Sequence, residues 1–102
     1  MRKIAMISDF IRDEIDGAEE YAETALEYKA LDKALADASY TAATQELAHV
    51  DMWHTQVTRM IKEQTATGKE VPAGMMDVYE WEHKKQIDAV TRIKLMLEQY
   101  KK

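Results

Sequence analysis

Helix-breaking residues are almost absent from most of this 102-residue chain, and that absence constrains its fold more than any other feature. The sequence contains one proline and three glycines. The proline and two of the glycines fall within a single stretch, residues 65–74. A weaker interruption comes at residues 29–32, where Asp32 is a suitable N-cap for a following helix. Long uninterrupted helices are therefore expected between these two breaks and on either side of them.

The segments between the breaks have the composition and the hydrophobic period of helices. They are rich in Ala, Glu, Leu, Lys and Met, which favour helical backbone, and their apolar residues recur in steps of three and four. No alternating pattern typical of a strand competes with this assignment. We predict an all-α fold in one domain of residues 1–102, with helices over about residues 3–29, 32–65 and 73–101.

Short connections between long amphipathic helices predict an antiparallel bundle. Three such helices leave a broad apolar groove, which a fourth helix from a partner chain would fill. A chain of this size also buries only a modest share of its surface and often gains stability from an oligomer or a metal. We therefore expect a homo-oligomer, either a dimer or a larger assembly.

Charge and composition exclude several classes of protein. The chain has 19 acidic and 14 basic residues, a net charge of −5, and no cysteine. It therefore has no disulfide and no thiolate metal site, and it lacks the basic surface with which proteins neutralise nucleic-acid phosphates. No segment approaches the roughly 18 apolar residues of a membrane helix. We expect a soluble cytoplasmic protein that binds neither nucleic acid nor membrane.

The most informative residues are polar side chains that interrupt the apolar faces. Glu14 lies between apolar residues of the first predicted helix. Glu46 and His49 lie three apart on the second, and Glu80 and His83 repeat this spacing on the third. Residues three apart project from the same side of a helix, and burial of unpaired carboxylates is costly. A divalent metal would compensate these charges, since carboxylate and imidazole ligands suit iron, manganese and zinc.

Part of the sequence resembles a known family. The segment Glu14-Ile-Asp-Gly-Ala-Glu-Glu-Tyr21-Ala, followed by Gln-Glu46-Leu-Ala-His49, is similar to the first half of ferritin-like proteins of the rubrerythrin type. The resemblance covers about half of the chain. It implies that Glu14, Glu46 and His49 are iron ligands and that Tyr21 can hydrogen-bond near the site. The family's fold is a four-helix bundle with two iron ions per site; manganese or zinc would also suit the ligands.

The resemblance implies oxidation of Fe(II) by dioxygen or peroxide, or reduction of peroxide. The cysteine-rich rubredoxin module of full-length rubrerythrins is missing, so a redox-active site would need an external electron donor. Two arrangements of the metal site remain open. Glu80 and His83 could complete a site within one chain, or two copies could each contribute Glu14, Glu46 and His49, as in the small encapsulated ferritins. The single-chain site is preferred because it gives Glu80 and His83 a role.

Two other interpretations remain beside this one. The chain could be a non-enzymatic helical oligomerisation or interaction module, or a bundle with a structural metal and no redox chemistry. His54 lies on the apolar face of the second predicted helix without a glutamate three residues before it. It is expected to be a core or interface histidine and not a ligand.

Overall fold

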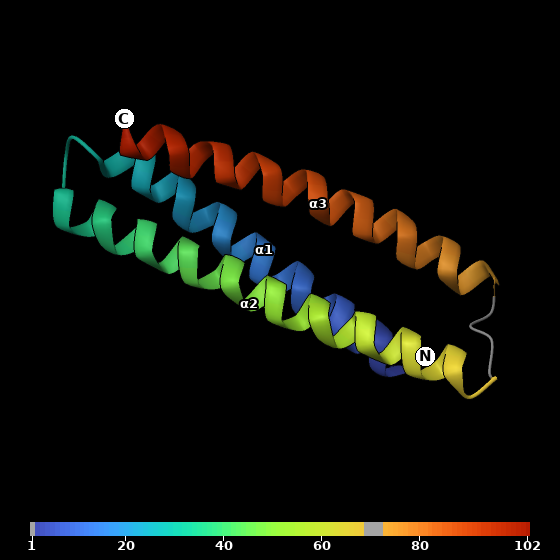
Figure 1. The fold of residues 1–102 in the computed structure, drawn as a ribbon. Coiled ribbons are helices and arrows are strands. Elements are labelled where there is room, and N and C mark those ends of the chain that lie inside the picture. Colours follow the sequence, from blue (N-terminus) through green and yellow to red (C-terminus); the bar gives the residue numbers. More distant parts are fainter. Residues whose placement is uncertain (1, 69–72) are drawn as a thin grey trace.

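The computed structural model describes residues 2–68 and 73–102 and contains three helices there (Figure 1). Helix α1 spans Arg2–Tyr28, α2 spans Lys33–Ala66 and α3 spans Ala73–Lys101. The all-α fold is confirmed, and the three predicted helices agree with these bounds to within one residue. The helices run along one long axis, and the molecule measures 56 × 19 × 18 Å.

Both predicted interruptions lie between helices for local physical reasons. The side chain of Asp32 accepts a hydrogen bond of 3.1 Å from the backbone N–H of Leu35, so Asp32 is the N-cap of α2 as expected. At the other end of α2, Gly68 follows the C-cap Thr67 with a φ of 75°, a conformation that favours glycine.

The core lies mainly between α1 and α2. Isoleucines and alanines recur on the inner side of α1, and small residues of α2 let the two helices approach closely. Figure 1 shows α1 between the other two helices, with α2 along one side of it and α3 along the other. Helix α3 joins the core through Ile93, Leu97 and Tyr100, all buried. The contact between α3 and α2 is far less extensive than the contact between α1 and α2.

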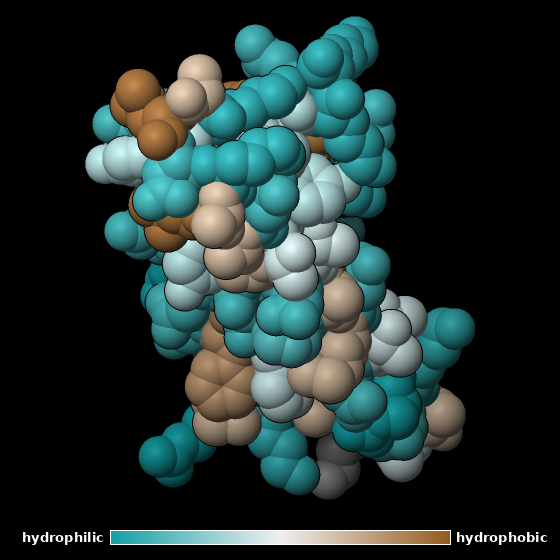
Figure 2. All heavy atoms as spheres, turned by 90° about the vertical axis from the view of Figure 1, so that its left-hand side faces the viewer, coloured by the Kyte–Doolittle hydropathy of each residue, from teal (hydrophilic) through white to brown (hydrophobic). Residues whose placement is uncertain are grey.

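Several large apolar side chains remain exposed on all three helices. Figure 2 looks onto the end that carries the C-terminus and the α1–α2 connection, where the surface is mostly hydrophilic with separate hydrophobic groups. The exposed apolar side chains of α1 and α2 are Met6, Phe10, Tyr21, Leu35 and Met52, and those of α3 are Val78, Trp81, Ile87 and Leu95. Among the described residues, none of the helices has the length and hydropathy needed to span a bilayer.

Candidate metal centre

Glu14, Glu46 and His49 come together between α1 and α2. One ligand atom from each of the three side chains lies within 4.8 Å of the other two. Glu14 comes from the middle of α1, and Glu46 and His49 project from adjacent turns of α2. The Nδ1 atom of His49 lies 3.3 Å from Oε2 of Glu14, so this contact joins the two helices. Three of the five predicted ligands are therefore neighbours.

The carboxyl group of Glu14 perturbs that of Glu46. The pKa of Glu46 is raised, first by hydrogen bonding with the neighbouring Glu14 carboxyl, then by partial burial and by the negative charge of Glu14. The positive charge of His49 opposes this shift. Two carboxylates in such proximity favour a shared proton or cation between them. The donor set of two carboxylates and an imidazole thus fits a divalent transition metal.

Gly17 leaves the backbone of α1 open beside Glu46. A Cβ atom on Gly17 would lie 3.6 Å from Oε2 of Glu46 and 4.0 Å from Cε2 of Tyr21. Tyr21 therefore lies one helical turn beyond Gly17 on the same side of α1 as the cluster. Within residues 2–68 and 73–102, no hydrogen bond joins its hydroxyl to the three ligands. The role of Tyr21 as a hydrogen-bond donor remains a prediction.

The cluster lies at the surface and not in the core. The His49 side chain is 48% exposed and the Glu14 side chain 24% exposed. On α1, Glu14 and Gly17 lie on the side opposite Glu19, because positions along a helix repeat every 3.6 residues. Glu19 faces α3, where its Oε2 lies 3.5 Å from a guanidinium nitrogen of Arg92. The cluster therefore opens to solvent on the face of the α1–α2 pair that is turned away from α3.

Glu80 and His83 do not join the cluster, so the preferred site within one chain does not form from the five predicted ligands. Among the described residues, the group with metal-binding spacing contains only Glu14, Glu46 and His49. Glu80 is exposed. The physical reason is the position of α3, which packs along the other side of α1 and cannot present its side chains to this face.

His83 instead contacts His54, the histidine for which no ligand role was predicted. The two rings stack with centroids 4.5 Å apart and planes inclined by 14°. Tyr79 lies beside His83 on the same helix, with ring centroids 5.6 Å apart. The expectation that His54 occupies a core or interface position agrees with its half-buried place between α2 and α3.

An aromatic pair that was not predicted from the sequence lies next to the cluster. The rings of Phe10 and Trp53 are 5.3 Å apart and inclined by 56°, and they join α1 to α2. Phe10 is four residues before Glu14, and Trp53 is four residues after His49, so the pair lies one turn from the ligands. The matched four-residue spacing from the predicted ligands on both helices is the sequence signal that could have revealed this pair.

Comparison with known proteins provides no further assignment. The chain matches no family model, no curated protein and no solved structure. Its function is therefore inferred from the geometry of the cluster and from the sequence pattern around it.

Proposed function

We propose that the chain is a ferritin-like iron-binding protein whose site is shared by two copies. The observation that carries the proposal is the open cluster of Glu14, Glu46 and His49 on the face turned away from α3. One chain offers three ligands, which leaves the coordination of a metal ion incomplete. Two copies related by a twofold axis would place two such clusters opposite one another.

The number and kind of ligands support this arrangement. Two copies would supply four glutamates and two histidines from four helices. Di-iron bundle proteins use the same set, namely a Glu from each of two helices and a Glu-x-x-His from each of the other two. In this chain Glu14 corresponds to the single Glu, and Glu46 with His49 to the Glu-x-x-His pair. Paired α1–α2 hairpins would thus form the four-helix bundle that one chain lacks.

The surroundings of the cluster suit contact with a second copy. Phe10 and Trp53 lie one turn to one side of the ligands, and Tyr21 lies to the other side. Phe10 and Tyr21 are 38% and 39% exposed, so apolar surface is available for burial in an interface. Because each chain carries a charge of −5, we expect metal ions to be needed to offset the repulsion between the facing carboxylates.

Bound iron would supply Fe(II)/Fe(III) chemistry with dioxygen or peroxide. Glu14 and Glu46 would hold the charge of the ions, and His49 would donate a neutral imidazole nitrogen. The second copy would cover the cluster and limit the access of water. A separate reductant would be needed for turnover, since the chain has no cysteine with which to hold an iron–sulfur or rubredoxin-type centre.

Metal analysis and native mass spectrometry of the protein loaded with Fe(II) test the proposal. We expect about one iron per chain, found only in dimers or multiples of dimers. Glu46→Ala and His49→Ala should each lose most of the iron and the iron-dependent dimer. Glu80→Ala and His83→Ala, which change the same residue types on α3, are matched controls that should bind iron normally.

Two results would contradict the proposal. Iron bound by a monomer with loss in the α3 variants would favour a site within one chain. A dimer that forms without iron and is unchanged in Glu46→Ala and His49→Ala would favour the non-enzymatic interaction module. Oxygen consumption on addition of Fe(II) then distinguishes a redox site from a structural metal.

A further inference from the structure

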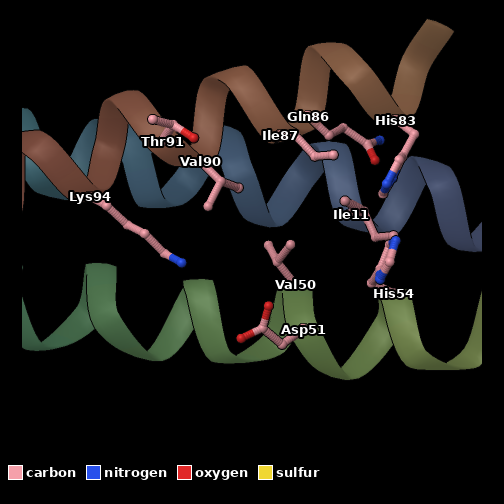
Figure 3. Close-up of a pocket in the computed structure, with 10 residues that line it drawn as sticks. All are labelled: Ile11, Val50, Asp51, His54, His83, Gln86, Ile87, Val90, Thr91 and Lys94. Carbon is pink, nitrogen blue, oxygen red and sulfur yellow. The ribbon is translucent and has the colours of Figure 1, made fainter. Parts of the chain in front are cut away.

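Aromatic contacts join α3 to α2 at two places. Near the C-terminus, Tyr100 stacks on Tyr40 with ring centroids 5.1 Å apart, and its hydroxyl donates a hydrogen bond to Asp37. Nearly five helical turns before Tyr100 along α3, His83 stacks on His54. Between these contacts the two helices border a groove of about 280 Å³, with α1 at its floor (Figure 3). The first half of α3 thus meets α2 through the imidazole pair.

Among residues 2–68 and 73–102, the imidazole pair has no partner of opposite charge within hydrogen-bonding distance. In the part of the chain that the structure describes, neither ring has a hydrogen bond or an ion pair with a carboxylate. Nδ1 of His83 is buried and has no hydrogen-bond partner among the described residues. Tyr79 covers the ring from its own helix. This environment favours neutral rings and offers little compensation for a positive charge.

Two charged groups line the groove, and neither changes the conclusion that the surroundings of the stack favour neutral rings. Asp51 lies on α2, three residues before His54, and Lys94 lies on α3, three turns beyond His83. Figure 3 shows both side chains in the groove, and α1 contributes the apolar Ile11. The single carboxylate and the single ammonium group of this lining have opposite signs. Lys94 is distant from the stack and Asp51 forms no hydrogen bond or ion pair with either ring among the described residues, so the neighbouring charge that lowers the pKa of His83 is that of His54.

Burial lowers the pKa of His83, and the charge of His54 lowers it further. A lowered pKa means that the detached ring binds a proton more tightly than the stacked ring. The stacked arrangement is consequently most stable above the ordinary histidine value of 6.5 and loses stability as the pH falls below it.

We propose that the His54–His83 stack is an acid-sensitive latch that holds the first half of α3 against α2. The neutral rings stack and keep the groove narrow, whereas a proton on the partly buried His83 ring, beside His54 and without a carboxylate partner among the described residues, breaks the stack and releases this part of α3 from α2. The second half of α3 stays in place, because Ile93 and Leu97 are buried and Arg92 pairs with Glu19. Release would expose apolar side chains that line the groove, among them Ile11 of α1 and Val50 of α2. The latch does not depend on the proposed iron site, which lies on the opposite face.

Nuclear magnetic resonance of the full chain tests the latch directly, since the sequence has only three histidines. The ring protons of His49, His54 and His83 can be followed from about pH 8 to pH 5. We expect the midpoint of His83 to lie below the ordinary histidine value of 6.5. In His54→Phe, which retains a stacked ring but removes its charge, the midpoint of His83 should move upward toward 6.5.

Amide hydrogen exchange reports the release itself. After correction for intrinsic exchange rates, residues 76–90 should lose protection by at least about tenfold between pH 7.5 and pH 5.5, while residues 93–100 change little. The double variant His54→Phe/His83→Phe should abolish this difference. His49→Gln, which removes the third imidazole, should retain it.

The proposal is wrong if wild-type residues 76–90 keep their protection at pH 5.5, or if the double variant still loses it. Should the double variant fail to fold, His83→Gln provides the same test, because it removes the ring whose pKa is lowered. A response of His83→Gln equal to that of the wild type would equally overturn the latch. None of these measurements requires iron, so their outcome is separate from that of the iron-binding experiments.

Discussion

At the scale of single residues, Glu46 shows that the candidate site places two carboxyl groups unfavourably close together in the metal-free protein. Its carboxyl group lies beside that of Glu14, which raises its pKa. A carboxyl group with a raised pKa in the folded state contributes stability while it is protonated, and this contribution falls as the pH rises through that pKa. In the metal-free protein near pH 7, the pair of carboxylates therefore opposes folding slightly.

Glu46→Gln tests this conclusion. The substitution retains the shape of the side chain and removes its charge, so the metal-free variant should melt a few degrees above the wild type at pH 7. The difference should shrink toward pH 4, where the carboxyl group is protonated in the wild type as well. Calorimetry at the two pH values measures it. The same variant should lose iron. A melting temperature below that of the wild type at pH 7 would show that the two carboxylates do not destabilise the metal-free fold.

At the scale of the helices, α3 is attached mainly at its second half. Ile93 has no exposed surface and lies in the core cluster with α1 and α2 side chains. The candidate metal site does not use α3, because its ligands come from the α1–α2 hairpin. Stability and metal binding should therefore respond differently to changes in α3.

Ile93→Ala separates these two properties. Removal of a buried isoleucine side chain costs about 2–5 kcal/mol, so the free energy of unfolding in urea should fall by that amount. At a temperature at which the variant is still folded, iron binding should remain within about twofold of the wild type. A parallel loss of iron binding by the folded variant would show that α3 supports the cluster after all.

At the scale of the whole molecule, the exposed apolar residues are divided between two faces. Phe10, Met6 and Tyr21 share the side of α1 that carries Glu14, whereas Leu95 lies on the outer side of α3. Only the first group would be buried if two copies share the metal site. The exposed residues of α3 would stay in contact with solvent.

Met6→Glu and Leu95→Glu form a matched pair that tests this division. Met6 is 48% exposed and Leu95 is 65% exposed, so both variants should fold. We expect Met6→Glu to weaken the iron-dependent dimer at least about tenfold, because a carboxylate would be buried in the interface. Leu95→Glu should leave the dimer unchanged. Sedimentation at several protein concentrations gives both dissociation constants, and equal values would place the interface elsewhere.

The sequence determined the bounds of the helices and the placement of Glu46 and His49 on one side of α2. Helix breakers confined to residues 65–74, together with apolar residues in steps of three and four, are local signals that need no tertiary information. The i, i+3 spacing of Glu46 and His49 is likewise local, since one helix suffices to bring the two side chains to the same side. These features could be predicted, and the structure agrees with them.

Only the tertiary structure decided which helices meet on which face. The pattern of Glu80 and His83 is the same as that of Glu46 and His49, and nothing in the sequence distinguishes a ligand pair from a pair that faces elsewhere. The distinction comes from α3, which packs on the side of α1 opposite Glu14 and brings His83 to His54. Helical periodicity fixes which residues share a face of one helix. The partner of that face is fixed by packing among distant segments, which local sequence does not encode.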